Sequence, residues 1–224
     1  MPFEEKLRQM SDRVNERHGS SLERSTKNLA GLVASVLRNG AWSELSGKAE
    51  KKLKDAAEET LFHSECLDAS GYLHEKVLSS GRIVDLKLKD DLRDVQDQIQ
   101  GMFDSKEAPE RGFVYIAWCQ RPEEYWYVGK ARTVERLNLS AHGKLARATA
   151  HATQLSLVFP SQSKEESLSG VEASIHMIIL ALTGKLPELN DRRETVPVHQ
   201  GGKHVDGLAK FLTKIANQVR ASAA

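Results

Sequence analysis

Five basic side chains in the C-terminal half of the sequence could together bind a chain of phosphate groups. They are Lys130, Arg132, Arg136, Lys144 and Arg147, and within this run only Glu135 carries the opposite charge. Lysine and arginine bind phosphate oxygens through charge and hydrogen bonds, so the run suits the backbone of DNA. The same residues could instead form an ordinary solvated helix face.

Two segments on either side of a turn have the composition of β-strands. Residues 112–118 and 125–129 are rich in aromatic and β-branched side chains, which favour strands. Residues 121–124, with the sequence Arg-Pro-Glu-Glu, are typical of a turn, so we predict a β-hairpin. Its strands carry Tyr115 and Tyr127, and either tyrosine taken alone could be an ordinary strand aromatic.

The remaining C-terminal sequence alternates between predicted helices and one further strand. We predict a basic helix over about residues 133–152, a third strand over 155–159, and an apolar helix over about 171–182 that Gly184 ends. A last amphipathic helix is predicted over about residues 206–219. The predicted order is therefore strand, strand, helix, strand and helix, followed by a C-terminal helix.

Taken in this order, the motifs resemble those of the GIY-YIG nuclease family. Phe113-Val114-Tyr115 resembles the end of the family's first strand, and Tyr127-Val128-Gly129-Lys130 resembles the paired strand. The family next has a helix with an arginine and then a histidine or tyrosine, which Arg136 and His142 match. The resemblance covers about residues 111–192, a little over a third of the chain.

The resemblance continues into the apolar helix. Glu172, near the start of that helix, matches the family's metal-binding glutamate, and it is the only acidic residue between Val171 and Leu186. Pro187-Glu188-Leu189-Asn190 matches the motif that supplies an asparagine. The resemblance implies an α+β fold, in which a helical N-terminal region precedes a small β-β-α-β-α domain with a three-stranded antiparallel sheet and a C-terminal helix.

The chemistry that the resemblance implies is metal-dependent hydrolysis of phosphodiester bonds in DNA. Glu172 would hold one Mg²⁺ or Mn²⁺ ion, and one protein ligand suffices because magnesium keeps several waters. Arg136 would hold the phosphate oxygens in its planar fork. Tyr115 would take or relay the proton of the attacking water, with His142 or Lys130 beside it.

Further residues would support this chemistry. Tyr127 would position phosphate or water, Asn190 would complete the catalytic set, and Gly129 would let the backbone approach the substrate closely. The residues that bind the DNA backbone would be Arg132, Lys144 and Arg147.

Three hypotheses of different classes follow from these motifs. The first is an active DNA endonuclease. The second is a catalytically silent DNA-binding module, in which Glu172 is merely an acidic residue in the first turn of a helix. The third is an interaction protein whose helical half matters most.

His176, four residues after Glu172, shares its helix face and is interpreted as a core histidine.

The N-terminal half is predicted to be helical, because no proline occurs between Pro2 and Pro109. A first helix is expected to end near Gly40, and a second to run from about Glu44 or Ser46 to Phe62. The apolar stripe of the first helix comprises Leu29, Leu32, Val33, Val36 and Leu37. A third helix has a short heptad seam, formed by Leu88, Leu92, Val95, Ile99 and Met102. These stripes predict a helical bundle, with a dimerising coiled coil as the alternative.

We therefore predict two domains, divided near the polar segment that Pro109 closes. Residues 1–107 would serve specificity, partner binding or formation of a homodimer through the N-terminal helices, and residues 108–224 would form the nuclease-like domain. Residues 1–110 hold 17 Lys and Arg against 21 Asp and Glu, whereas residues 111–224 hold 15 against 10. The basic C-terminal half suits a DNA partner.

Cysteine content and the N-terminal sequence predict a cytoplasmic protein. The two cysteines, Cys66 and Cys119, have neither metal-binding nor redox spacing and fit a reducing compartment. The first residues lack the basic start and apolar run of a signal peptide. No apolar stretch is long enough to span a bilayer, so no membrane partner is expected.

Overall fold

The computed structural model describes residues 1–38, 47–88, 92–104, 112–134, 137, 143–161 and 165–192. Its helices are α1 (Phe3–Arg38), α2 (Gly47–Leu73), α3 (Leu92–Asp104), α4 (Lys144–Thr149) and α5 (Glu165–Thr183), and a π-helical segment (His74–Leu78) extends α2. Its strands are β1 (Arg82–Lys87), β2 (Phe113–Cys119), β3 (Glu124–Ala131) and β4 (Gln154–Phe159). The fold is therefore of the mixed α+β class, as predicted.

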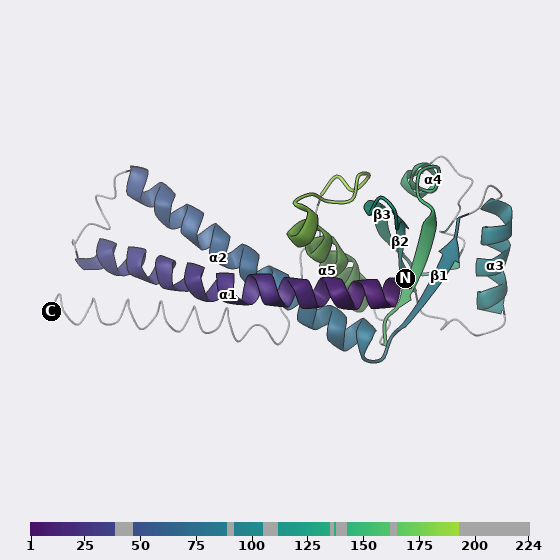
Figure 1. Ribbon diagram of the computed structural model, residues 1–224, viewed down its shortest axis with the longest axis horizontal. Helices are drawn as coiled ribbons and strands as arrows, with labels where there is room; N and C mark the ends of the chain where they lie inside the picture. The colour runs from purple at the N-terminus through teal and green to yellow at the C-terminus, as the bar shows by residue number, and fades with distance from the viewer. Residues whose placement is uncertain are drawn as a thin grey trace.

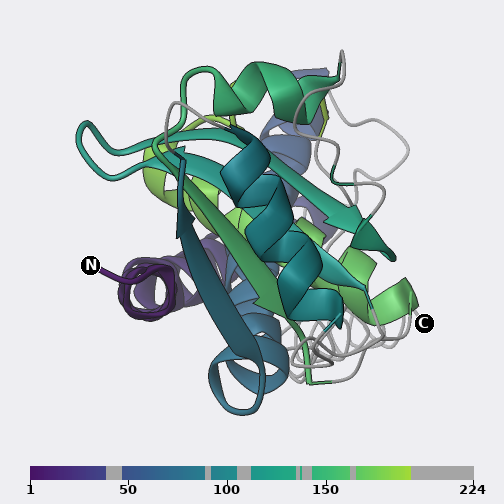
Figure 2. The same ribbon diagram turned by 90° about the vertical axis from the view of Figure 1, so that its right-hand side faces the viewer.

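The four strands form one antiparallel sheet in the order β1-β4-β2-β3, with helices on both faces (Figures 1 and 2). One face packs against α1, α2 and α5, and its core includes Val114, Ile116 and Val128 from the strands. The other face packs against α3 and α4, and its core includes Tyr115 and Leu157. This alternation follows from the pleat of each strand, which sends successive side chains to opposite faces.

The N-terminus of α1 is built into the sheet. The Oδ2 atom of Asp85 in β1 accepts a hydrogen bond from the backbone N–H of Phe3 at 2.7 Å, which satisfies a donor in the first turn of the helix. The Oδ1 atom of Asp85 accepts from the Ser156 hydroxyl at 2.6 Å, and that hydroxyl accepts from the Trp118 indole N–H at 2.9 Å. The Phe3 and Trp118 rings lie 5.3 Å apart. One core therefore joins residues from both predicted domains, whose separate roles stay a prediction.

The prediction of three strands is wrong, because β1 pairs with β4 along its whole length. The N-terminal region is consequently not helical throughout. Five of the six side chains of β1 are exposed or partly exposed, and only Leu86 is buried. Such a strand carries little hydrophobic signal, since β1 lies at the edge of the sheet and is defined by backbone pairing with a distant segment.

The helices differ from the predicted ones in extent and packing. Helix α2 continues beyond Phe62 to Leu73, because the sequence holds no proline that would stop it. The heptad seam is not a bundle or coiled-coil face: Leu88 precedes α3, and Val95 and Ile99 of α3 are buried on the sheet. Of the basic helix predicted for residues 133–152, the part over Lys144–Thr149 is confirmed as α4, and residues 135–136 and 138–142 lie outside the described residues.

Several predictions are confirmed or lie outside the described residues. The β2–β3 hairpin, the third predicted strand (β4) and the apolar helix (α5) are present, and Gly184 ends α5 with a positive φ of 77°. The predicted end of the first helix at Gly40 and the C-terminal helix over 206–219 lie outside the described residues. Among the described helices, none combines the length and apolar character needed to cross a bilayer.

Candidate active site

The β2–β3 hairpin brings the two tyrosine motifs into register. Tyr115 lies opposite Gly129, Ala117 opposite Tyr127, and Val114 opposite Lys130. Tyr115 and Tyr127 therefore share the face covered by α3 and α4, and their ring centroids are 6.0 Å apart. Lys130 lies on the other face, toward α5. Because β3 is the edge strand, the two sets can meet only around that edge.

Gly129 is required by the close approach of Tyr115. A Cβ atom added at Gly129 would lie 2.6 Å from the Tyr115 Oη atom and 2.7 Å from its Cζ atom. The Tyr115 ring thus lies over Gly129 and brings its hydroxyl to β3, the edge strand of the sheet. Gly129 was predicted to let the substrate approach the backbone closely, but the tyrosine ring fills this space.

On the opposite side of β3, Lys130 joins the hairpin to helix α5. The Lys130 Nζ atom lies 3.2 Å from Glu172 Oε2 and donates to the Ser169 Oγ atom at 2.6 Å. Ser169 and Glu172 are three residues apart on α5, so they lie on one face of that helix. Glu172 is mostly buried, and a buried carboxylate needs a cation or hydrogen-bond donors beside it.

The alternative hypothesis placed Glu172 in the first turn of its helix, but Glu172 does not lie there. Helix α5 begins at Glu165, so Glu172 lies in its third turn, away from the helix N-terminus and its partial positive charge. His176, one turn further on, is buried in the same helix, as predicted for a core histidine.

Asn190 binds the backbone of the edge strand. Its side-chain oxygen accepts from the Val128 N–H at 2.9 Å, and its amide nitrogen donates to the Val128 carbonyl at 2.8 Å. The backbone N–H groups of Glu188 and Leu189 donate to the carbonyls of Tyr125 and Trp126. The predicted asparagine therefore covers the edge of β3 up to the residue before Gly129, which is a positioning role.

The basic residues Lys144, Arg147 and Arg132 lie around the same end of the sheet. Lys144, at the start of α4, forms an ion pair with Asp191, whose carboxyl pKa is lowered by this hydrogen bond. Arg147, one turn later, and Arg132, just after β3, are exposed. Arg136 and His142 lie outside the described residues, so their predicted roles stay predictions.

Sequence reasoning missed two features of this region. Ser169 could have been found from its position one helical turn before Glu172. Trp126 is the extra residue of a β-bulge opposite Ala117 and Trp118, and its ring stacks on the His151 ring with centroids 4.5 Å apart. A bulge depends on pairing between strands, so the sequence of β3 alone gives no signal for it.

The donor set near Glu172 fits a hard divalent cation that keeps most of its waters. Glu172 offers one carboxylate and Ser169 one hydroxyl oxygen, both oxygen donors of the kind that Mg²⁺ prefers. In the part of the chain that the structure describes, no group of three His, Cys, Asp or Glu residues could hold a metal by protein ligands alone. Only a site that relies on water ligands therefore fits these residues.

Comparison of the chain with protein-family models, with curated proteins and with solved structures finds no match.

Proposed function

We propose that this protein is a metal-dependent DNA endonuclease that hydrolyses phosphodiester bonds at the Gly129–Lys130 end of β3. The observation that carries the proposal is the contact between Lys130 and Glu172. These residues belong to separate motifs of the GIY-YIG resemblance and are distant in the sequence. Their contact beside a glycine that the Tyr115 ring crosses supports the resemblance.

The residues divide the chemistry between the two sides of the edge strand. Glu172 would hold the Mg²⁺ or Mn²⁺ ion, which neutralises charge on the phosphate and polarises the leaving oxygen. Lys130 adds a positive charge beside the phosphate, and the Tyr115 hydroxyl orients the attacking water and relays its proton. Water attacks phosphorus, the bond to the leaving oxygen breaks, and that oxygen takes a proton. A DNA backbone laid across the edge of β3 can meet both groups.

Residues outside the described part of the chain complete this scheme by resemblance. Arg136 would bind the non-bridging oxygens of the scissile phosphate, and His142 would assist proton transfer.

Tyr127, beside Tyr115, would position the water or the phosphate. Lys144, Arg147 and Arg132 would hold the flanking phosphates, because all three are exposed near the hairpin.

One observation favours a second candidate, the catalytically silent DNA-binding module. The Lys130 ammonium already neutralises the Glu172 carboxylate, so the pair can exist without a metal ion. In that case the basic residues bind DNA and Glu172 serves only to place Lys130. The two candidates differ in one respect, which is whether a divalent cation can displace or join the lysine.

Cleavage of supercoiled plasmid tests the proposal. Purified protein is incubated with plasmid in Mg²⁺, in Mn²⁺ and in EDTA, beside the Glu172→Ala and Arg136→Ala variants. We expect nicking in both metals, none in EDTA, and a loss of about 100-fold or more in each variant. Glu166→Gln is the matched control, because Glu166 lies on the same helix with an exposed side chain.

The outcomes separate the candidates. Full activity of Glu172→Ala would show that the metal ligand is misplaced, and equal loss in Glu166→Gln would point to damage to α5 as a whole. Absence of cleavage together with salt-dependent retardation of the plasmid in a gel would favour the silent module. Absence of both would contradict a DNA partner.

A further inference from the structure

Charge is strongly segregated along the helical hairpin formed by α1 and α2. Residues 24–54 hold seven Lys and Arg and two Asp and Glu, and the described parts of this range, 24–38 and 47–54, lie at the end of the hairpin away from the sheet. Residues 55–75, which return along α2 toward the sheet, hold six Asp and Glu and no Lys or Arg. The overall acidity of the N-terminal half therefore hides a basic end, which we call the basic tip.

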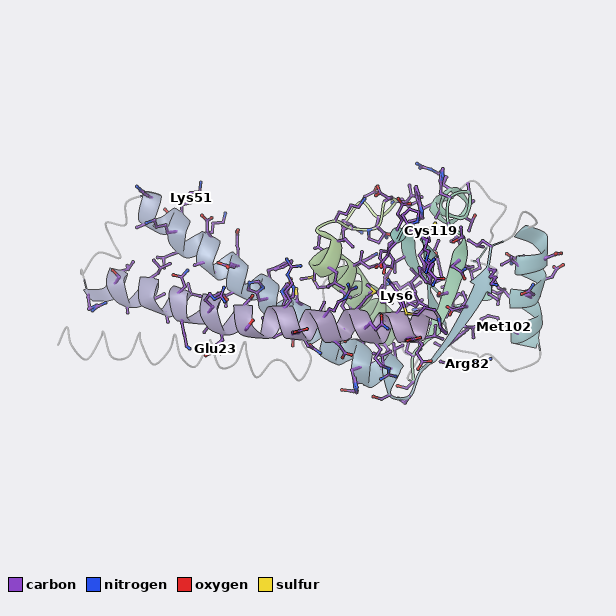
Figure 3. The ribbon with its side chains drawn as sticks, viewed as in Figure 1. Lys6, Glu23, Lys51, Arg82, Met102 and Cys119 are labelled. Carbon is purple, nitrogen blue, oxygen red and sulfur yellow. The ribbon has the colours of Figure 1, made fainter. Side chains whose placement is uncertain are left out.

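The basic side chains of the tip are directed to solvent. All seven are exposed, namely Arg24, Lys27, Arg38, Lys48, Lys51, Lys52 and Lys54. Lys27 pairs with Glu23 and Lys54 pairs with Glu58, both within one helix and both at highly exposed positions. Such exposed pairs contribute little stability and exchange easily for other anions. In Figure 3, Lys51 points outward at the far end of α2.

The tip projects well beyond the sheet. Val14 is the last residue of α1 in the core that α1 shares with the sheet. From Val14 to Arg38 the helix rises about 36 Å at 1.5 Å per residue. Figure 1 shows α1 and α2 extending together away from the sheet toward this end. One turn of B-DNA spans about the same length, roughly 34–36 Å. Along α2, the Tyr72 hydroxyl packs against Gly170, next to Ser169 of the candidate site. Lys51 lies 21 residues before Tyr72 in the same helix, about 32 Å away at 1.5 Å per residue. The tip can therefore reach phosphates about one helical turn from those at the candidate site.

We infer that the basic tip binds the phosphate backbone of double-stranded DNA at about one helical turn from the candidate active site. This inference rests on the proposed function for the identity of the polymer. Long exposed lysines suit phosphate contacts that carry no sequence information. The acidic stretch that follows repels the backbone, so the duplex contacts the tip and the sheet but not the intervening part of α2.

Binding of a fluorescein-labelled 30-base-pair duplex, measured by anisotropy in EDTA at several salt concentrations, tests the inference. The variant carries Lys48→Gln, Lys51→Gln and Lys52→Gln, which remove charge but keep good helix formers. The matched control carries Arg8→Gln, Lys87→Gln and Arg121→Gln, three exposed positions at the sheet end of the molecule. Circular dichroism verifies that each protein keeps its helix content.

We expect the tip variant to lose about 10-fold or more in affinity and to lower the slope of log K against log salt by about 2–3, with little change in the control. The gain in affinity between 10- and 30-base-pair duplexes should also vanish in the tip variant only. Equal losses in both variants, or no loss in the tip variant, would overturn the inference. So would binding of the tip to polyglutamate and not to DNA, which would indicate an acidic protein partner.

Failure of this inference is distinguishable from failure of the proposed function. The binding assay contains no metal and needs no cleavage, so a loss of affinity specific to the tip variant supports the inference even if the protein nicks no plasmid. Conversely, metal-dependent nicking by wild type with an unaffected tip variant would leave the endonuclease intact and remove the tip as a DNA contact.

Discussion

Two lysine–glutamate ion pairs hold the two ends of β3, and they differ in which partner is buried. At the turn before β3, the Lys6 side chain is 9% exposed and that of Glu123 is 39% exposed. At the other end, the Lys130 side chain is 30% exposed and that of Glu172 is 11% exposed. The first pair buries its cation and the second buries its carboxylate, so their chemical possibilities differ.

The Lys6–Glu123 pair is an anchor. Lys6 comes from α1, and Glu123 also accepts a hydrogen bond from the Tyr125 hydroxyl at 2.9 Å. Burial alone would raise the pKa of Glu123, but the hydrogen bonds from Lys6 and Tyr125 outweigh it and lower the pKa below its usual value. Burial, with Glu123 beside the phenol, raises the pKa of Tyr125 far above its usual value. The buried Lys6 cation is thereby held by a carboxylate that two donors fix in place.

The Lys130–Glu172 pair is arranged so that another cation can replace the lysine at Glu172. Its buried member is the carboxylate, which requires a cation, and its more exposed member is the lysine, whose long side chain can move toward solvent. A divalent cation entering from solvent can therefore replace or join Lys130 at Glu172. Which member of an ion pair is buried, and not the pair itself, therefore separates an anchor from a candidate metal site.

Among the variants that distinguish the two ion pairs, Lys130→Met is expected to have the largest effect. Removal of the lysine takes one cation away from the buried Glu172 carboxylate, and we expect a loss of about 3 kcal/mol in the free energy of unfolding in EDTA. Mg²⁺ should restore much of this loss, because it binds the carboxylate in the folded state only. Urea unfolding with and without Mg²⁺ measures both. Lys6→Met is the control, and an equal stabilisation of both variants by Mg²⁺ would show that the two ion pairs do not differ in metal binding.

A smaller effect is expected from Gly129→Ala, which tests the close approach on the other side of β3. The added Cβ meets the Tyr115 ring, and we expect a loss of about 2 kcal/mol from overpacking. Tyr115→Leu in the same chain should relieve the clash, so the double variant should be more stable than the sum of the single changes predicts. Strict additivity in thermal unfolding would contradict the contact between Tyr115 and Gly129.

Asn190→Ala is expected to cost about 1–2 kcal/mol, since it removes both side-chain hydrogen bonds to Val128. Hydrogen exchange should show lost protection at the Val128 amide, which Asn190 now binds. Because Asn190 positions the strand and is not expected to hold metal, affinity for Mn²⁺ should change little. A selective loss of metal affinity without loss of amide protection would instead place Asn190 in the metal site.

The smallest effect is expected from Glu123→Gln, through pH. The folded-state pKa of Glu123 is lowered from the usual 4.5, so its contribution is complete above about pH 4.5 and is lost as pH falls through the lowered value. We expect a contribution of about 1 kcal/mol or less at neutral pH, because Glu123 is partly exposed. The stability of wild type and variant should therefore converge as pH falls from 6 to 3. A stability difference between wild type and variant that stays constant over that range would show that the ion pair is not the cause of the difference.

Local patterns predicted the parts of the fold that local interactions determine. The β2–β3 hairpin followed from aromatic strands around a turn, and α5 followed from its apolar composition and the glycine at its end. The pairing of Tyr115 with Gly129 follows once the hairpin is given. Glu172 and Lys130 were both named from the sequence as candidate site residues, but their contact depends on how α5 packs against β3.

Features that depend on distant pairing escaped prediction. Strand β1 is mostly exposed and is fixed by β4, more than sixty residues later, and the N-terminus of α1 is fixed by Asp85 of that strand. The heptad of α3 predicts a helix with one buried face but does not reveal which element packs against that face, and in the structure this element is the sheet. A periodic stripe predicts that a helix is buried on one side, whereas its partner is a property of the whole chain.

Binding of Mn²⁺, measured by electron paramagnetic resonance in wild type and in Glu172→Gln, would show whether the Glu172 carboxylate accepts a divalent cation at the site where Lys130 now contacts it. We predict that wild type binds one Mn²⁺ ion that Mg²⁺ displaces, and that Glu172→Gln loses this site while Glu123→Gln keeps it. Equal binding by wild type and Glu172→Gln, or no binding by wild type, would contradict the account.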